Sequence, residues 1–335
     1  MTGAARWRWL LGLLTVALAA VAALAWARHW IDQPLPLRAA SVEFTVGAGA
    51  SPRQVAQGWV EAGVEAPAWM LYEWFRWSGQ SRQIRAGSYL AETGVTPRTL
   101  LAMMVEGREL LETVRLIEGW TLRQWRAELA RAPHLEPESQ GLDEAALMAA
   151  LGAPGEPGEG RFFPDTYAYP RGASDLKVMR QAYLAMQRQL AQAWAQRPPD
   201  SPLNTPEQAL ILASIVEKET GRTDERGLVA GVFTNRLRIG MPLQTDPTVI
   251  YGLGQAFDGN LRKRDLLADG PFNSYTRAGL PPTPIAMPGL ASLQAAVNPA
   301  PTRALYFVAR GDGSSQFSDT LADHNRAVNR YQRGR

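Results

Sequence analysis

The stretch Ile211 to Gly221, ILASIVEKETG, closes an apolar run with two glutamates, Glu217 and Glu219, on either side of a lysine. From Ala209 to Val216 every residue except Ser214 is apolar. At about 100° per residue these side chains cover the whole circumference of a helix. Because a helix that is apolar all round is buried, this stretch predicts a core helix that ends in charged residues.

The two glutamates are candidate proton donors. A carboxyl at the end of a buried helix is partly desolvated, which raises its pKa and suits a general acid that works near neutral pH. Small residues lie one turn before Glu217 and leave space in front of its carboxyl, whereas larger ones precede Glu219. The alternative is that either glutamate only pairs with Lys218, Arg222 or Arg226.

Polar side chains follow this helix in two segments. A second helix is expected over residues 224–239, and the polar turn after it precedes Pro247. Residues 272–290 combine hydroxyl and amide side chains with four prolines, which predicts a rigid extended wall able to hold a hydroxyl-rich ligand. The candidate binding residues in these two segments are Gln244, Thr245, Asp246, Asn273, Tyr275 and Thr276.

Composition excludes several classes of protein. The chain has 335 residues, 46% of them hydrophobic, which is enough for about two domains with their own cores. The net charge is only +3 and the basic residues are scattered, so no nucleic-acid partner is expected. Without cysteine and with three separated histidines, the chain predicts no thiolate chemistry and no metal site, and no motif requires a cofactor.

The N-terminus predicts a membrane segment. Residues 9–27 carry no charge and are long enough to cross a hydrocarbon core, with residues 1–8 as a short cytoplasmic tail and 28–40 as a juxtamembrane linker. The alternative is a cleaved signal peptide. With either an anchor or a signal peptide, the rest of the chain is expected to be exported.

A small α+β module is expected over residues 41–111. A strand and a glycine turn lead to a helix that begins at Ser51 with Pro52 in its first position, and further helices are expected over 66–77 and from Thr96 or Thr99 to Gly107. Six aromatic residues fall in this module at largely helical spacing, which favours core packing over a sugar platform; they are Trp59, Trp69, Tyr72, Trp74, Phe75 and Trp77.

The remaining residues, 112–335, form the second expected domain. It begins with TVRLIEGWTLRQW, a strand that leads into a helix, and continues through a Pro- and Gly-rich loop, 151–161, to the aromatic segment EGRFFPDTYAYP. Towards the C-terminus, ALYFVARGDGSSQFS predicts a hairpin that turns at 311–313.

Several of these segments resemble the YceG-like family of endolytic murein transglycosylases. They are IEGW, EGRFFPDTY, LASIVEKETG, VFTNRLRIGMPLQTDPTVIYG, YTRAGLPPTPIAMPG and LYFVARGDGSSQFSDTLADHN. The resemblance implies an α+β protein with a single N-terminal transmembrane helix, a LysM-like module over 41–111 and a mixed α/β YceG-like catalytic domain over 112–335. It also implies a single-pass inner-membrane location with the catalytic domain in the periplasm.

The resemblance further implies a lyase that cuts nascent peptidoglycan between N-acetylmuramic acid and N-acetylglucosamine and leaves 1,6-anhydro ends, which would stop glycan elongation. The catalytic glutamate of the family falls on Glu217, with Glu219 as the alternative. Glycan strands would be the substrate, and a cell-wall synthesis complex is a possible partner. The rival interpretations are a muramidase-type hydrolase with Asp246 as second carboxylate, and a non-catalytic peptidoglycan-binding or division scaffold.

Overall fold

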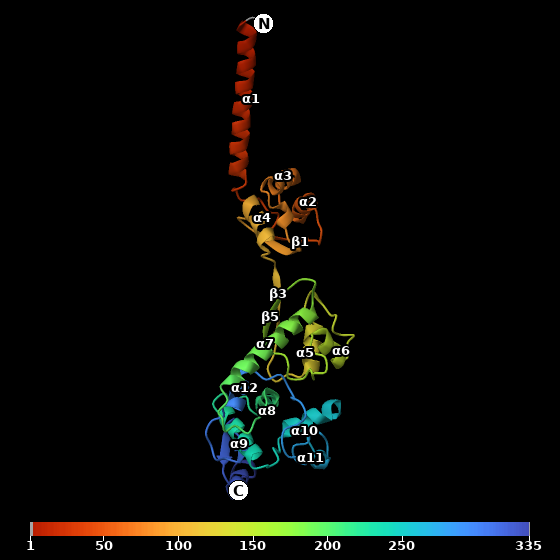
Figure 1. Ribbon diagram of the computed structural model, residues 1–335, viewed down its shortest axis with the longest axis vertical. Coiled ribbons are helices and arrows are strands. Elements are labelled where there is room, and N and C mark those ends of the chain that lie inside the picture. The colour runs from red at the N-terminus through yellow and green to blue at the C-terminus, as the bar shows by residue number, and fades with distance from the viewer. Residues whose placement is uncertain (1–2, 335) are drawn as a thin grey trace. The chain divides into compact units, whose positions relative to one another are not determined.

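The computed structural model describes residues 3–334 and divides the chain into two compact units, Met1–Glu112 and Thr113–Arg335. Figure 1 shows the elements of each unit. The helices and strands up to the boundary are α1 (Gly3–Trp30), β1 (Ser41–Val46), α2 (Pro52–Ala62), α3 (Ala68–Trp77), the short 3-10 helix η1 (Ser81–Gln83), β2 (Gly87–Glu92), α4 (Pro97–Glu106) and β3 (Leu111–Leu116), which straddles it.

Helix α1 contains the apolar segment expected to cross a membrane. Its stretch Trp9–Trp30 is 22 residues long and has a mean hydropathy of 2.3; it is exposed up to His29, and Trp30 is half-buried. At 1.5 Å per residue it measures about 33 Å, enough for a hydrocarbon core. Of the expected tail 1–8, residues 3–8 continue this helix, and Met1 and Thr2 lie outside the described residues.

The expected linker 28–40 is partly packed on the first unit. Asp32 accepts two hydrogen bonds from the Arg98 guanidinium, at 2.6 and 3.1 Å. The backbone N–H of Arg98 donates to the carbonyl of Ile31, and Leu35 is buried. Because these contacts begin at the end of α1, the chain that leaves the helix is held against the module.

The module itself is a two-stranded antiparallel sheet with three helices. Strands β1 and β2 pair from Ser41 opposite Glu92 to Val46 opposite Gly87, and α2, α3 and α4 gather around them (Figure 1). Helix α2 begins at the predicted position, because Ser51 forms a capping box with Gln54.

The aromatic residues of this module divide between core and surface. Trp59 and Phe75 are fully buried, as predicted, but Trp69 and Trp77 are 66% and 69% exposed, so the core assignment was wrong for these two. Eight residues apart, they lie on one outer ridge of α3 with Glu73, which accepts a hydrogen bond from the Trp77 indole. Helix α3 turns only its other face towards the core.

The second unit is built mainly of helices. Its elements after β3 are α5 (Leu122–Leu129), β4 (Leu135–Glu136), α6 (Glu144–Ala150), β5 (Asp165–Pro170), β6 (Ala173–Ser174), α7 (Asp175–Ala195), α8 (Pro206–Glu219), α9 (Arg226–Arg238), α10 (Asp246–Leu253), the 3-10 helix η2 (Gly254–Ala256), α11 (Lys263–Leu267), α12 (Leu290–Val297), β7 (Tyr306–Ala309), β8 (Ser315–Ser318) and α13 (Leu321–Gln332).

Strands in this unit form only two-stranded sheets within the described residues, β3 with β5, β4 with β6, and β7 with β8. The β7–β8 pair is the predicted hairpin. Residues 268–289, which cover the expected extended wall except its last residue, contain no helix or strand, and that last residue, Leu290, begins α12. The unit is therefore mixed α and β, as predicted, and its helices rather than a sheet hold the core together.

Helix α7 connects two hydrophobic clusters. Its first half packs with Trp125 and Phe162, and its second half packs with α8. Every residue of α8 from Ala209 to Val216 is buried, which confirms the predicted core helix. The one polar residue among them, Ser214, donates to the Ile211 carbonyl and accepts from the Ile285 N–H, so its burial leaves no unpaired hydroxyl.

Candidate active site

Glu217 lies in the last turn of α8 with its side chain only 7% exposed. Its Oε2 atom accepts a hydrogen bond of 3.0 Å from the backbone N–H of Gly289 and one of 2.7 Å from the Ser292 hydroxyl. Its Oε1 atom lies 3.8 Å from the Arg226 guanidinium. Oε2 therefore accepts two hydrogen bonds, whereas no described residue donates one to Oε1.

These donors come from the beginning of α12. Gly289 is the N-cap of this helix and Ser292 is its third residue. The first N–H groups of a helix have no partner inside the helix, so its N-terminus presents donors to a neighbouring carboxyl. The packing of α12 on α8 thus fixes the position of Glu217.

Glu118 brings a second carboxyl to the same place. Its neighbour Gly119 donates to the carbonyl of Met287, and the N–H of Met287 donates to the carbonyl of Trp120, both at 2.8 Å. A Cβ atom added to Gly289 would lie 2.0 Å from Glu118 Oε1, so the Glu118 carboxyl lies directly over the Cα of that glycine. Two segments far apart in sequence are held together by this pair of backbone hydrogen bonds.

The pKa of Glu118 is raised by its surroundings, which include the Glu217 carboxyl. Partial burial raises the pKa of Glu118, the Glu217 carboxyl raises it further, and Arg226 opposes both effects. Arg226 is itself 9% exposed, and within the described residues its buried Nε atom has no hydrogen-bond partner. The site therefore combines two carboxyls with one arginine that retains an unused donor.

Glu219 belongs to a different polar cluster. It stands two residues from Glu217, about 200° around the helix, and its Oε2 accepts a 2.6 Å hydrogen bond from Thr245. Burial raises the pKa of Glu219, as expected at the end of a buried helix; the Thr245 hydroxyl opposes this rise and Asp246 adds to it. The hydroxyl of Tyr275 donates to Asp246 at 2.5 Å.

The six predicted binding residues divide between this cluster and the loop behind it. Thr245, Asp246 and Tyr275 lie with Glu219, and Gln244 precedes them with a left-handed backbone (φ 47°). The Asn273 amide is buried and donates to carbonyls at the end of α11. The Thr276 hydroxyl donates to Asp269 on the surface.

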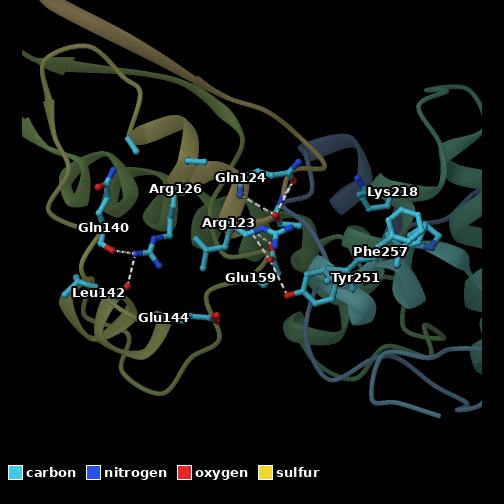
Figure 2. A pocket seen from close by; sticks show the side chains of 18 residues that line it. Arg123, Gln124, Arg126, Gln140, Leu142, Glu144, Glu159, Lys218, Tyr251 and Phe257 are labelled. Atoms are coloured by element: carbon cyan, nitrogen blue, oxygen red, sulfur yellow. Dashed lines mark hydrogen bonds between the residues drawn. The ribbon is translucent and has the colours of Figure 1, made fainter. Parts of the chain in front are cut away.

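A cavity of about 1080 Å³ opens beside Lys218 (Figure 2). Its walls come from α5, the beginning of α6, the end of α8, α10 and the beginning of η2, together with residues of the loops around them. Figure 2 shows Arg123 and Gln124 near Glu159, and Tyr251, Phe257 and Lys218 from the other wall. The lining residues are Thr121, Leu122, Arg123, Gln124, Arg126, Ala127, Ala130, Gln140, Leu142, Glu144, Glu159, Lys218, Pro247, Ile250, Tyr251, Gly254, Phe257 and Ile285.

Glu159 is the buried carboxyl of this cavity. Its oxygens accept the backbone N–H of Leu122, at 3.0 and 3.2 Å, and the Tyr251 hydroxyl lies at 3.3 Å. Burial raises the pKa of Glu159 to about 7, and these hydrogen bonds only partly oppose the rise. Glu159 thus ties the start of α5 to α10 through a carboxyl that titrates near neutral pH.

Sequence reasoning named Arg226 as a possible partner of Glu217, and the structure places it 3.8 Å from Oε1, but it did not single out Glu118, Ser292 or Glu159. The glutamates stand inside IEGW and EGRFFPDTY, but nothing in the spacing of those segments relates them to α8. Over residues 3–334 no group of three or more His, Asp or Glu side chains is arranged to hold a metal ion.

The sequence model of the YceG-like family matches residues 44–330. The chain belongs to this family. A relative from Bacillus subtilis (strain 168), named endolytic murein transglycosylase, is 37% identical over 175 residues, which are 52% of this chain and 48% of the relative. Relatives of the same name from Streptococcus pneumoniae strains D39 and R6 are 26% identical over 337 aligned positions, covering 90% of this chain and 61% of theirs. The chain thus spans about half to three fifths of the length of these relatives.

A solved structure shares the YceG-like fold. The yceG-like protein lmo1499 from Listeria monocytogenes, in a crystal structure at 2.6 Å, is 26% identical. The match covers 85% of this chain and 98% of the other, with a TM-score of 0.55. The predicted family is therefore confirmed, and so is the mixed α/β, YceG-like fold, while the LysM-like character of residues 41–111 stays a prediction.

Proposed function

We propose that this YceG-like protein is an endolytic peptidoglycan lytic transglycosylase, a carbon–oxygen lyase that cuts nascent glycan strands and so ends their elongation. The observation that carries the proposal is the position of Glu217, a buried carboxyl oriented by Gly289 and Ser292 beside the second carboxyl of Glu118. The names of the bacterial relatives support the same activity.

In the proposed reaction Glu217 is first acid and then base. Because Oε2 already accepts two hydrogen bonds, we assign the transferred proton to Oε1. That proton passes to the glycosidic oxygen as the bond from C1 of N-acetylmuramic acid breaks, which leaves a hydroxyl on N-acetylglucosamine. The C6 hydroxyl of the same muramoyl residue then attacks C1 and returns its proton to Glu217.

The intramolecular attack consumes no water and forms the 1,6-anhydro end. Because the nucleophile belongs to the sugar that reacts, proximity replaces the second, water-activating carboxylate of an inverting glycosidase. We assign Glu118 a different task, in which its carboxylate faces the positive charge that develops at C1 in the transition state.

The polar cluster around Glu219 is proposed to hold the sugars on the other side of α8. Gln244, Asp246, Tyr275 and Thr276 would contact hydroxyl groups directly. Thr245 and Asn273 are buried and would position that segment.

The first unit is proposed to tether and guide the catalytic unit. Helix α1 would be a single-pass anchor in the inner membrane with the rest of the chain in the periplasm, where new glycan emerges and a synthesis complex would be close. Residues 41–111 would act as a LysM-like module, supported by the pairing of β1 with β2 and the helices around them.

Mass spectrometry of reaction products tests the proposal. Uncrosslinked glycan strands are treated with the full-length protein in detergent, and with its Glu217→Gln and Glu219→Gln variants. We expect anhydro-ended products that disappear with Glu217→Gln alone. Reducing ends would instead establish a hydrolase, and intact strands from folded wild-type protein would favour a non-catalytic scaffold.

A further inference from the structure

The cavity next to Lys218 directly adjoins the candidate catalytic carboxyl. A Cβ atom added to Gly119 would lie 3.8 Å from both Glu217 Cγ and Lys218 Cδ. Beyond Gly119 the chain continues into Thr121 and Leu122, which line the cavity. The catalytic site and the cavity are therefore adjacent along both α8 and the segment that leads into α5.

Two cationic side chains of the cavity, Arg123 and Lys218, keep free donors. Arg123 is exposed, and within residues 3–334 its guanidinium makes no ion pair or side-chain hydrogen bond. Lys218 gives one hydrogen bond to the Gly119 carbonyl and keeps two further donors. Of the two acids, Glu159 is buried and accepts the Leu122 N–H, whereas Glu144 is exposed and accepts the Gly158 N–H through Oε1.

Much of the remaining wall is aliphatic, and the space is large. Leu122, Ala127, Ala130, Leu142 and Ile250 all contribute to it. A volume of about 1080 Å³ lies just above the usual range of small-ligand pockets, about 300–1,000 Å³, so a single sugar ring would not fill it. The cavity suits a longer ligand with small apolar side chains and carboxylates.

We propose that this cavity receives the peptide stem of the muramoyl residue whose bond is cut, with Arg123 and Lys218 pairing with the stem carboxylates. The inference rests on the proposed function. The stem is attached through the lactyl ether at C3 of the sugar whose C1 reacts, so it must leave the catalytic site within a few bonds of Glu217. Its small side chains and free carboxylates match the aliphatic wall and the two cations.

A comparison of two substrates tests this assignment. Full-length protein in detergent is given uncrosslinked strands with intact stems, or the same strands after an amidase has removed the stems. We expect wild-type kcat/KM to favour the stem-bearing strands at least tenfold. Arg123→Ala should reduce that preference about tenfold, as expected from the loss of one charge pair. Ala127→Trp, which fills the cavity without removing a charge, should reduce it as well.

A control variant outside the cavity shows whether the loss of preference is specific to residues that line it. Arg188→Ala removes an exposed arginine of α7 that does not line the cavity and should keep the wild-type preference. If Arg123→Ala and Ala127→Trp lowered kcat/KM equally on both substrates, the cavity would hold sugar rather than the stem. A wild-type protein without any preference between the two substrates would also overturn the assignment.

A binding measurement keeps the inference testable if the proposed reaction is wrong. Full-length Glu217→Gln is titrated calorimetrically with muramoyl disaccharide that carries a stem, and with the same disaccharide without it. Tighter binding of the stem-bearing form that is weakened by Arg123→Ala supports the cavity even without cleavage. Cleavage of both strands with equal binding of both disaccharides would refute the cavity and leave the proposed function standing.

Discussion

Glu118 and Glu217 both contact the same glycine: the Glu118 carboxyl lies over the Cα of Gly289, and Glu217 Oε2 accepts its N–H at 3.0 Å. Since Gly289 is also the N-cap of α12, one residue aligns two carboxyls with the beginning of a helix. The proposed chemistry depends on this arrangement, and the following predictions test it.

Replacing Glu118 should slow cleavage strongly. Glu118→Gln removes the carboxylate proposed to face the developing charge, and we expect kcat to fall about 100-fold, as when a preorganised electrostatic group is lost. Rates on glycan strands, measured by product mass spectrometry, would show this. Glu128→Gln on α5, whose carboxyl does not line the cavity, is the matched control.

The same experiment extends to the double variant. If the two carboxyls act in one step, Glu118→Gln combined with Glu217→Gln should be no slower than Glu217→Gln alone, because residues that act as a unit are not additive. A wild-type rate in Glu118→Gln would remove Glu118 from the site.

Adding one methyl group at Gly289 should displace Glu118. The backbone of Gly289 has φ −80°, which alanine adopts readily, but the new Cβ would lie 2.0 Å from Glu118 Oε1. The carboxyl at the end of that side chain must move, and a misplacement of about 1 Å can cost about 100-fold in rate. We therefore expect Gly289→Ala to unfold at nearly the wild-type temperature while its cleavage rate drops at least tenfold.

Gly141→Ala is the matched control for this change. A Cβ atom at Gly141 meets no atom within 4 Å. The Gly141→Ala protein should therefore cleave glycan strands at the wild-type rate. If Gly289→Ala also keeps the full rate, the contact between Gly289 and Glu118 has no functional role.

Asp246 should act in binding rather than in chemistry. It lies with Tyr275 in the cluster around Glu219, not with Glu217. Asp246→Asn weakens hydrogen bonds to the sugar, so KM should rise about tenfold while kcat stays within a factor of a few. Steady-state kinetics on glycan strands would separate the two parameters.

The hydrolase interpretation predicts the opposite outcome. There Asp246 is the second carboxylate that activates water, and Asp246→Asn would lower kcat by orders of magnitude with little change in KM. Asp258→Asn, which alters an exposed carboxylate paired with Arg262, serves as the control.

Glu159 should make stability depend on pH. Its pKa is raised from 4.5 to about 7 by burial, so between these values the folded protein binds more protons than the unfolded chain. Protonated Glu159 therefore stabilises the folded state, and this contribution to the free energy of unfolding is fully present below about pH 4.5 and is lost as the pH rises through 7. The shift corresponds to about 3 kcal/mol.

Glu159→Gln mimics the protonated form and tests this directly. Wild type and variant should unfold at similar temperatures at pH 5, and the variant should be the more stable of the two at pH 8. Thermal unfolding of both full-length proteins in detergent across this range provides the measurement. A difference between them that does not change with pH would show that Glu159 does not titrate in this window.

The helix that carries Glu217 was predictable because its signals are local. An N-cap at Thr205, Pro206 after it and a continuous apolar run define α8 without reference to the rest of the chain. The same holds for the long uncharged segment of α1 and for the capping box of α2. Periodicity could not decide which face of α3 is covered, which is why Trp69 and Trp77 lie on the surface.

The sequence by itself therefore determined the family, the buried helix and its two terminal glutamates. Only the tertiary structure brought Glu118 and Ser292 to Glu217, and Thr245 to Glu219. The physical reason is that helix formation depends on neighbours within one or two turns. The contacts around the two carboxyls depend instead on the packing of α12 on α8 and on the two backbone hydrogen bonds that join Gly119 and Trp120 to Met287, segments separated by most of the domain.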